Sequence, residues 1–140
     1  MSATVRTLMR FRPPLARLEW EGGEFEGEVM FATACNGPMF GGGMLIAPDA
    51  EYDDGRLDLV IVRKVTRLAL LRVFPRVFRG THVDHPAVSI HRTPWVRMRF
   101  APGTLLACDG EVQGTVPPEG LEMGLRERAL WVAAGPRPSR

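Results

Sequence analysis

The stretch ARLEWEGGEFEGEVMFATACN, residues 16–36, decides the fold. Before a glycine-containing turn at residues 21–24, polar and apolar side chains alternate, and Leu18 and Trp20 share one face. After the turn, the apolar density rises toward Cys35. Alternation with a period of two is typical of a half-buried strand, and glycine readily adopts the positive φ of a tight turn. We therefore expect an antiparallel hairpin with one solvated end and one buried end.

Strand and helix signals continue along the chain. Residues 57–62, LDLVIV, are apolar enough for a strand that is buried on both faces. Thr66 is expected to N-cap a helix from Arg67 to about Phe78, which Pro75 kinks or shortens and Gly80 ends. Further β segments are expected at 87–92, 95–100, 104–109, 119–123 and 129–133.

Together these segments predict a mainly β protein, a two-sheet β-sandwich or open barrel with one central helix and a short N-terminal helix. The short helix covers residues 2–11, with Ser2 or Thr4 as its cap, and Pro13 stops it. We divide the chain into a helical part at 1–13, a β-rich domain at 14–134 and a frayed tail at 135–140.

Length and composition limit the function classes. The chain has 140 residues, of which 45% are hydrophobic and 24% charged, as expected for one soluble globular domain. The net charge of +2 is too balanced for an electrostatic nucleic-acid binder. No apolar run reaches the ~18 residues of a membrane span, and no signal peptide is evident. We therefore expect a cytoplasmic protein.

Arginine is concentrated in one part of the chain. Lys64 is the only lysine among 18 basic residues, a bias typical of a GC-rich genome. At helical spacing the arginines after residue 62 would line a solvated basic face that could rest on anionic lipid headgroups. That placement predicts peripheral contact with the inner face of the membrane. These arginines are Arg63, Arg67, Arg72, Arg76 and Arg79.

The sequence Asp109-Gly110-Glu111 is the sharpest local signal for chemistry. If it lies on a strand, its two carboxylates project from the same face, and partial burial would raise a pKa into the range of a general base. The alternative is a hairpin turn, because Asp-Gly between strands is a common turn sequence.

Four other features of the sequence are weaker signals for chemistry. Asp53-Asp54-Gly55 is either an acidic hairpin tip or part of a site for a hard cation. Gly41-Gly42-Gly43 lacks the ending of a phosphate-binding P-loop and fits a flexible turn. Cys35 and Cys108 are expected to be buried strand residues without a disulfide. His82 and His85 lack a third metal ligand at a recognisable spacing.

The motifs in this order resemble the C-terminal half of the bacterial diacylglycerol kinase-like lipid kinases, relatives of sphingosine and ceramide kinases. The resemblance covers roughly residues 5–133. It rests on NGPMFGGGM at 36–44, APDA at 47–50, DDGRLD at 53–58, GTH at 80–82 before His85-Pro86, and DGE at 109–111.

The resemblance implies a β-rich domain that packs against a separate α/β nucleotide-binding domain, with the active site between them. It makes Glu111 the general base for the lipid hydroxyl, with Asp109 beside it. It places a structural Mg²⁺ on the Asp54 side chain and the carbonyls of Glu51 and Arg56. The residues expected to line the cleft near the domain junction are Asn36, Gly41, Gly42 and Gly43.

The sequence also departs from this family. The nucleotide loop GGDGT does not occur, so ATP is expected to bind only through an N-terminal domain that this sequence lacks. We expect the isolated chain to be inactive as a kinase. The partners implied are a lipid substrate at the membrane surface and a nucleotide-binding half. An unpaired sheet edge makes a homodimer a further hypothesis.

Two alternatives remain beside the acceptor-side half of a lipid kinase. One is a non-catalytic lipid-binding or regulatory module of the same fold. The other is a hydrolase that uses Asp109 and Glu111 as an acid and base pair, without a nucleotide. The sequence does not identify the lipid.

Overall fold

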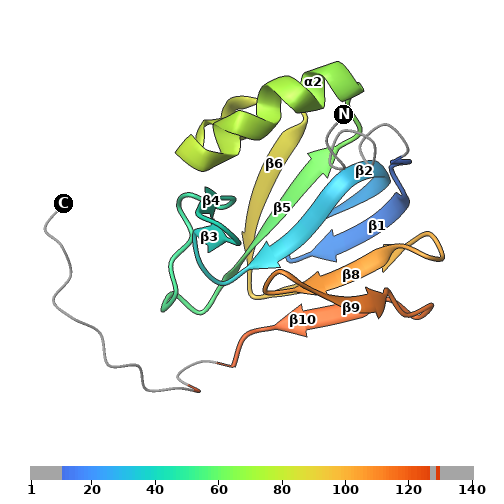
Figure 1. Cartoon of the computed structure of the whole chain (residues 1–140). Helices are drawn as coiled ribbons and strands as arrows, with labels where there is room; N and C mark the ends of the chain where they lie inside the picture. The colour runs from blue at the N-terminus through green and yellow to red at the C-terminus, as the bar shows by residue number, and fades with distance from the viewer. Residues whose placement is uncertain (1–10, 127–128, 130–140) are drawn as a thin grey trace, which may run out of the picture.

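The computed structural model describes residues 11–126 and 129 (Figure 1). The predicted helix over 2–11 and the predicted strand over 129–133, apart from Phe11 and Ala129, lie outside these residues, as does the tail. The domain boundaries therefore stay a prediction. Within the described residues, no helix is both long and apolar enough to cross a membrane.

The main sheet has six antiparallel strands in the spatial order β10-β7-β1-β2-β5-β6. Their bounds are β1 (Leu15–Trp20), β2 (Gly23–Cys35), β5 (Leu57–Arg63), β6 (Val88–Thr93), β7 (Trp95–Phe100) and β10 (Leu121–Gly124). Two hairpins complete the fold, β3 (Met39–Phe40) with β4 (Met44–Leu45), and β8 (Leu105–Cys108) with β9 (Glu111–Thr115). The predicted mainly β fold is confirmed, and the described strands do not close into a barrel.

The long strand β2 divides the main sheet into two halves. Its first part pairs with β1 as far as Glu28, opposite Leu15, and its second part pairs with β5 from Val29 to Cys35. The register shifts between Val29 and Phe31, where one extra residue enters β2. A bulge of this kind bends a strand and increases its local twist. The predicted β1–β2 hairpin is confirmed, and beyond Glu28 the edge of β2 is no longer paired with β1.

Strand β5 is buried on both faces, as its sequence predicts. Alternate side chains from Leu57 to Ile61 enter one core, while Val60 enters a second core on the opposite face. The first core lies within the curved sheet, and its buried members are Ala16, Leu18, Val29, Leu57, Leu59, Ile61, Val96 and Met98. The second lies beneath the helical segment, and its buried members are Cys35, Ile46, Ala47, Ala50, Val60, Val77 and Val88.

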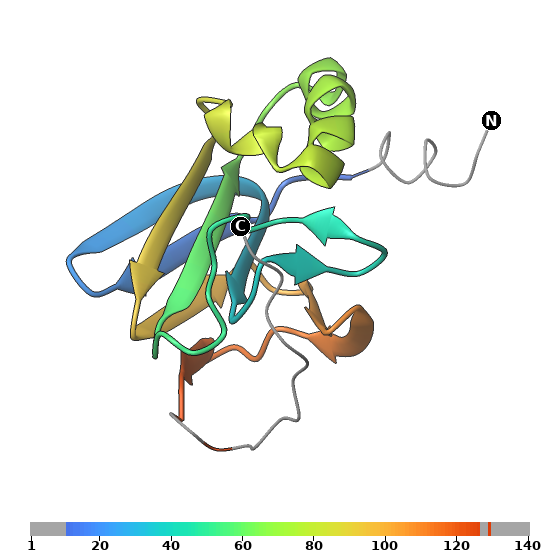
Figure 2. The same cartoon turned by 90° about the vertical axis from the view of Figure 1, so that its left-hand side faces the viewer.

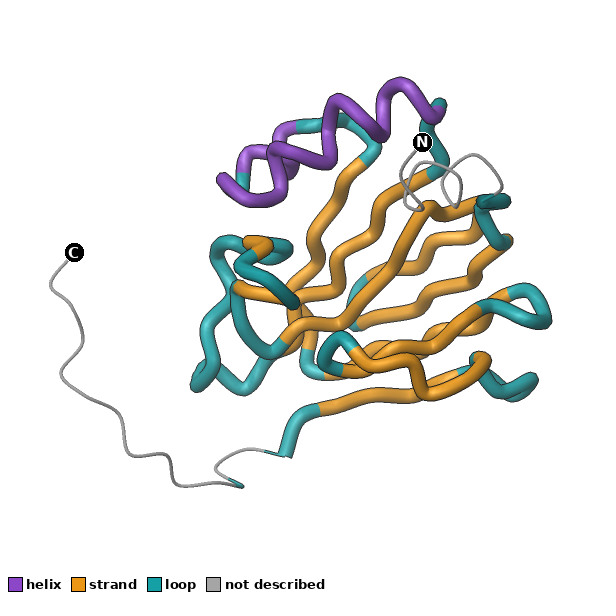
Figure 3. Tube along the Cα trace, in the orientation of Figure 1, coloured by secondary structure: helices purple, strands orange, loops and turns teal. Residues whose placement is uncertain are grey.

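The helical segment covers one end of the sheet, across the ends of β5 and β6 (Figures 1 and 3). It consists of α2 (Arg67–Val73) followed by the 3₁₀ helices η1 (Phe74–Arg79) and η2 (Thr81–Asp84). The Thr66 side chain accepts a hydrogen bond from the Ala69 N–H at 3.2 Å, and Gly80 has a φ of +70°. Both predicted helix ends are therefore confirmed, and the segment tightens to 3₁₀ geometry from Phe74, the residue before Pro75.

In Figure 2, α2 and the β3–β4 and β8–β9 hairpins all lie to the same side of β5 and β6. The sequence does not predict strand β9. It follows β8 after the two-residue turn Asp109-Gly110, and Cys108 pairs with Glu111. This hairpin is the element that positions the predicted catalytic residues.

Candidate functional site: an apolar cavity and an acidic loop

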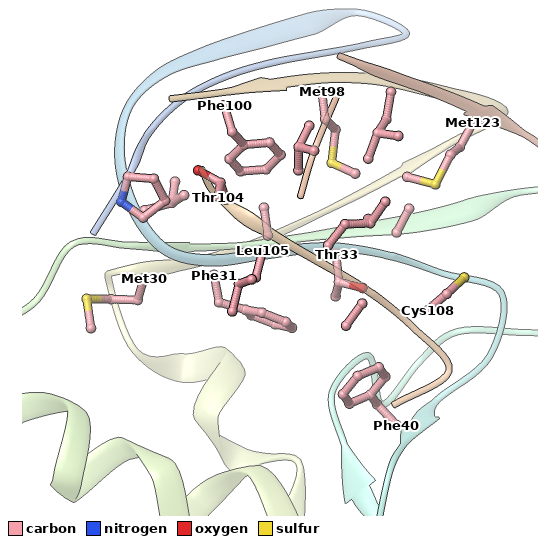
Figure 4. A pocket seen from close by; sticks show the side chains of 18 of the residues that line it. Met30, Phe31, Thr33, Phe40, Met98, Phe100, Thr104, Leu105, Cys108 and Met123 are labelled. Carbon is pink, nitrogen blue, oxygen red and sulfur yellow. The ribbon is translucent and has the colours of Figure 1, made fainter. Parts of the chain in front are cut away.

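An apolar cavity of about 790 Å³ lies where the two halves of the sheet diverge at β2. Residues 29–35 of β2 form one wall, Met98, Phe100 and Met123 form a second, and residues 104–108 lie across the opening. Figure 4 shows Leu105 among these side chains, with Met30 and Phe31 on one side of it and Met98 and Met123 on the other. The volume is in the range of about 300–1,000 Å³ that small-molecule sites have.

Two of the predicted site residues, Asn36 and Asp109, line one part of this cavity. Asn36 follows directly on β2, and Asp109 follows directly on β8. Cys35 and Cys108, which end these two strands, also line it. The structure thus brings two polar side chains to a cavity that is otherwise mainly apolar.

Of the two interpretations of Asp109-Gly110-Glu111, the structure confirms the hairpin turn, and the arrangement of both carboxylates on one strand is wrong. Asp109 has a φ of +49° and Gly110 a φ of +87°, so these two residues form the turn itself. Two successive positive φ values are characteristic of a tight two-residue hairpin turn. Glu111 is the first residue of β9, and both carboxylates are exposed. The partial burial expected for this pair is therefore not found within the described chain.

The triple glycine does not reach the cavity in this structure. Gly41, Gly42 and Gly43 form the exposed turn between β3 and β4, and all three have positive φ. The neighbouring Met39 and Phe40 do line the cavity. The triple glycine therefore acts here as the turn that holds this short hairpin.

The two cysteines differ in their surroundings. Cys35 is buried and Cys108 is exposed, and both are free thiols. Burial is the largest cause that raises the pKa of the Cys35 thiol above its ordinary value. The expectation that both are buried is wrong for Cys108, because the end of the β8–β9 hairpin projects into solvent.

The acidic loop of residues 49–55 is held against β6 by one arginine. Arg92 Nη2 donates a hydrogen bond to the Asp49 carbonyl at 2.6 Å. Its Nε lies 3.6 Å from a carboxylate oxygen of Asp54 and 3.6 Å from one of Asp58. Asp58 and Arg92 are direct partners across β5 and β6. The loop that carries the predicted metal site is thus fixed by ionic contacts to the main sheet.

Two carboxylate oxygens in this loop region are buried without a hydrogen-bond partner in the described residues. They are Asp54 Oδ2 and Asp58 Oδ2, whereas Asp54 Oδ1 accepts a hydrogen bond from the Arg56 N–H at 2.9 Å. Burial raises the pKa of the Asp58 carboxyl, Arg92 acts in the opposite direction, and Asp54 adds to the rise. Carboxylate oxygens that accept no hydrogen bond are suitable ligands for a hard cation, so these residues fit Mg²⁺ beside the ion pair with Arg92.

The side chains of the three residues in the predicted metal site have different surroundings. Asp54 faces the ionic cluster, whereas Glu51 is exposed and the Arg56 side chain lies 3.6 Å from Glu21. Within the described chain, no three carboxylate, histidine or cysteine side chains converge as a metal-binding group. Any cation here would therefore rely on backbone carbonyls or water for its remaining ligands.

Arg92 is the member of this cluster that the sequence does not indicate, and Asp58 is expected only as part of the acidic stretch DDGRLD at 53–58. Asp58 is the one charged residue in LDLVIV, and a charge on a strand buried on both faces needs a partner. That signal points to a buried ion pair. The partner could not be named, because the register of β5 against β6 is not readable from the sequence.

This arrangement, a curved antiparallel sheet with a cavity at its bulged strand, defines a β-sandwich-like domain. The fold is similar to that of a solved structure named as a putative diacylglycerol kinase from Bacillus anthracis str. Sterne. The TM-score is 0.58 at 17% identity, over 86% of this chain and 40% of that one.

Residues 1–132 match the family model described as the YegS C-terminal NAD kinase beta sandwich-like domain. The chain belongs to this family. It is 36% identical over 118 residues to a diacylglycerol kinase of Mycobacterium tuberculosis (strain H37Rv), which covers 84% of this chain and 38% of that protein. It is 30% identical over 112 residues to the Bacillus subtilis (strain 168) diacylglycerol kinase, over 80% of this chain and 37% of that protein. The chain thus spans less than two fifths of these relatives' length.

Proposed function

We propose that this chain is the acceptor-side domain of an ATP-dependent lipid kinase that phosphorylates the hydroxyl of a diacylglycerol-like lipid. The observation that carries the proposal is the apolar cavity with Asp109 and Asn36 in its lining. Acyl chains require an apolar cavity, whereas a reacting hydroxyl requires polar groups at the edge of it. Membership of the family and the similarity to diacylglycerol kinases support this assignment.

In this proposal Glu111 is the general base and Asp109 is its neighbour in the hairpin turn. Glu111 takes the proton of the acceptor hydroxyl as the hydroxyl oxygen bonds to the γ-phosphorus of ATP, and ADP leaves. Phosphoryl transfer depends mostly on positioning and charge neutralisation. ATP is held by a nucleotide-binding part that this sequence does not contain, so the isolated chain is inactive toward diacylglycerol.

A chimaera tests the role of Glu111. In it this chain replaces the matching 118 residues of the M. tuberculosis diacylglycerol kinase. Glu111→Gln should lower kcat for dioctanoylglycerol by about 10²- to 10⁴-fold, because a positioned base contributes that much. Gln113→Ala is the control, because Gln113 is also exposed on β9. A Glu111→Gln chimaera with kcat within threefold of its parent, a margin far below the effect of a base, would remove Glu111 from this role.

The alternative is a lipid-binding module without catalysis. It is favoured by the exposed position of both Asp109 and Glu111, which in this chain alone are far from the environment of an activated base. A chimaera that binds both ATP and dioctanoylglycerol but transfers no phosphate would favour the module. Turnover that depends on Glu111 would exclude it.

We also propose that Asp54 binds a structural Mg²⁺ with the carbonyls of Glu51 and Arg56. The buried Asp54 Oδ2, which accepts no hydrogen bond from the described residues and lies 3.6 Å from Arg92 Nε, supports this site. MgCl₂ should raise the thermal midpoint relative to EDTA, because an ion that binds only the folded state stabilises it. Asp54→Asn should abolish the rise. Glu51→Gln should retain it, because the backbone carbonyl is unchanged. A midpoint that does not respond to Mg²⁺ would contradict the site and leave Arg92 as the counter-charge that the described residues supply to Asp54.

A further inference from the structure

Four large apolar side chains are exposed along the outer side of the helical segment. Leu68, Leu71, Phe74 and Phe78 have exposed fractions of 57%, 51%, 51% and 48%. Leu68, Leu71 and Phe74 follow one another at spacings of three residues, which places them along one side of the helical segment. Phe78 lies four residues after Phe74, within the 3₁₀ helix η1. The rings of Phe74 and Phe78 meet edge to face at 6.0 Å between centroids. We call these four residues the apolar stripe.

The apolar stripe is not the side of the segment that packs on the sheet. Val73 and Val77 are buried, and Val77 belongs to the core beneath the helices. The Thr66 cap and the buried Gly80 fix the two ends of the segment. The segment is therefore held firmly on one side and presents a second apolar surface to solvent on the other. Exposed apolar patches of this kind mark interaction sites.

The surroundings of the apolar stripe are strongly basic. Residues 59–83 contain no aspartate or glutamate and six basic residues, Arg63, Lys64, Arg67, Arg72, Arg76 and Arg79. Arg76 lies 3.8 Å from Asp84. Arg67, Arg72 and Arg79 are exposed and form no ion pair with any residue that the structure describes. The positive charge of these three arginines is thus available to a partner.

We propose that this segment docks the protein on an anionic phospholipid surface. The apolar stripe inserts among the acyl chains at the interface, and the flanking arginines bind the lipid phosphates. An amphipathic helix that combines aromatic or leucine side chains with basic residues binds membranes in this way. An anionic bilayer supplies an apolar interior for the stripe and negatively charged phosphates for the arginines. A protein partner would need an apolar groove and acidic side chains placed to fit each of these residues.

The docking surface lies near the cavity described above. Val29, which lines the cavity, pairs with Arg63 at the end of β5, and α2 begins four residues later. Docking would therefore bring this end of the cavity toward the bilayer. The inference goes beyond the proposed function, because it holds for vesicles that contain no diacylglycerol.

Co-sedimentation tests the docking. The purified chain is mixed with vesicles of phosphatidylcholine alone, or of phosphatidylcholine with phosphatidylglycerol, both without diacylglycerol. We expect at least about tenfold stronger partitioning to the anionic vesicles, since each basic residue near such a surface adds to binding. Added NaCl should weaken the binding by screening.

Two sets of variants separate the two parts of the surface. Leu71→Ser with Phe74→Ser should weaken partitioning at least about tenfold by removing inserted apolar area. Arg67→Gln with Arg72→Gln and Arg79→Gln should remove the preference for anionic vesicles. All five positions are exposed, so the variants should fold. Leu105→Asp, which alters the cavity, is the matched control and should bind vesicles as the parent does.

The outcomes are distinct. No binding of the parent chain to anionic vesicles, or equal binding by the apolar-stripe variants, would overturn the docking. A concentration-dependent dimer that Leu71→Ser with Phe74→Ser abolishes would assign the surface to a second copy and also overturn it. If the Leu105→Asp chain no longer binds dioctanoylglycerol but still binds anionic vesicles, the docking is supported. Docking on the bilayer and binding of the acceptor lipid then depend on different residues.

Discussion

Asp58 carries a carboxylate on β5, a strand that is buried on both faces. The ion pair with Arg92 offsets part of the cost of burying this charge. The Asp58 side chain is only 5% exposed, whereas that of Arg92 is 42% exposed. A buried charge without a partner is costly, and an ion pair with further hydrogen bonds offsets part of that cost. Arg92 therefore ties β5, β6 and the acidic loop together at the proposed metal site.

His82 is the second residue whose charge depends on its place in the fold. It is fully buried, and its Nε2–H donates to the Ile46 carbonyl at 3.1 Å, while Nδ1 has no partner in the described residues. Burial is the largest cause that lowers the pKa of His82 below its ordinary value. It therefore supports the loop after β4 through its hydrogen bond to Ile46.

The lowered pKa of His82 predicts how stability depends on pH. Below about pH 6.5 the unfolded chain binds a proton at this residue more readily than the folded chain does. The free energy of unfolding should therefore fall as the pH falls from about 6.5 through the folded pKa. NMR titration of the His82 ring should give a midpoint below the ordinary value. A midpoint at or above that value would contradict the buried neutral imidazole.

At the scale of elements, Gly80 determines how the helical segment meets the sheet. Its φ is +70°, and a Cβ at this position would lie 2.8 Å from Pro48 Cγ. Two constraints thus act together, a left-handed backbone and a close approach to the loop after β4. At Gly42 the φ is +60° and a Cβ would have open space around it, so only the backbone constraint applies there.

These two glycines form a matched pair for mutation. Gly42→Ala should destabilise the chain by about 1 kcal/mol, because the left-handed conformation is unfavourable for alanine. Gly80→Ala should cost about 2–4 kcal/mol, since the contact with Pro48 adds overpacking to the same backbone cost. Urea unfolding measures both changes in the free energy of unfolding, provided that the m-value of each variant equals that of the parent chain. If both variants lose the same free energy of unfolding, Pro48 moves away from the new methyl group without an energetic cost, and the proposed overpacking at Gly80 is wrong.

The sequence predicts those elements in which local pattern and burial agree. The β1–β2 hairpin, β5 and the Thr66-capped helix follow from alternation, apolar density and capping chemistry. Strand β9 could not be predicted, because EVQGT is exposed and carries no apolar periodicity. For the same reason the sequence does not decide between one strand and a hairpin turn at Asp109-Gly110-Glu111, and the positive φ values of Asp109 and Gly110 show the turn.

The site is predictable only in part. Asp109 and Asn36 can be named from their motifs, but the cavity that they line is formed by segments far apart in the sequence. Its walls come from β2, β7, β8 and β10, and their proximity depends on the bend of β2 at Met30. Such a bend leaves no composition signal. The roles of Glu111 and of the metal ligands stay predictions.

At the scale of the whole molecule, the two halves of the sheet are joined by β2 and diverge beyond it. Apolar side chains that line the cavity remain exposed, including Met39, Tyr52 and Leu105. In the proposed kinase, part of this surface would be covered by the nucleotide-binding part and by the bound lipid. A homodimer through the edge of β6 or β10 stays a prediction, which size-exclusion chromatography would test.

The central claim is that the cavity under β8 binds the acceptor lipid, and binding of dioctanoylglycerol to the purified chain tests it most directly. Leu105 and Val112 form a matched pair, because they are 71% and 67% exposed on the same hairpin and only Leu105 lines the cavity. We predict saturable binding that Leu105→Asp weakens at least about tenfold and that Val112→Asp leaves unchanged, since a charge in an apolar site is costly. Equal binding by the parent chain and both variants, or no binding by the parent chain, would contradict the claim.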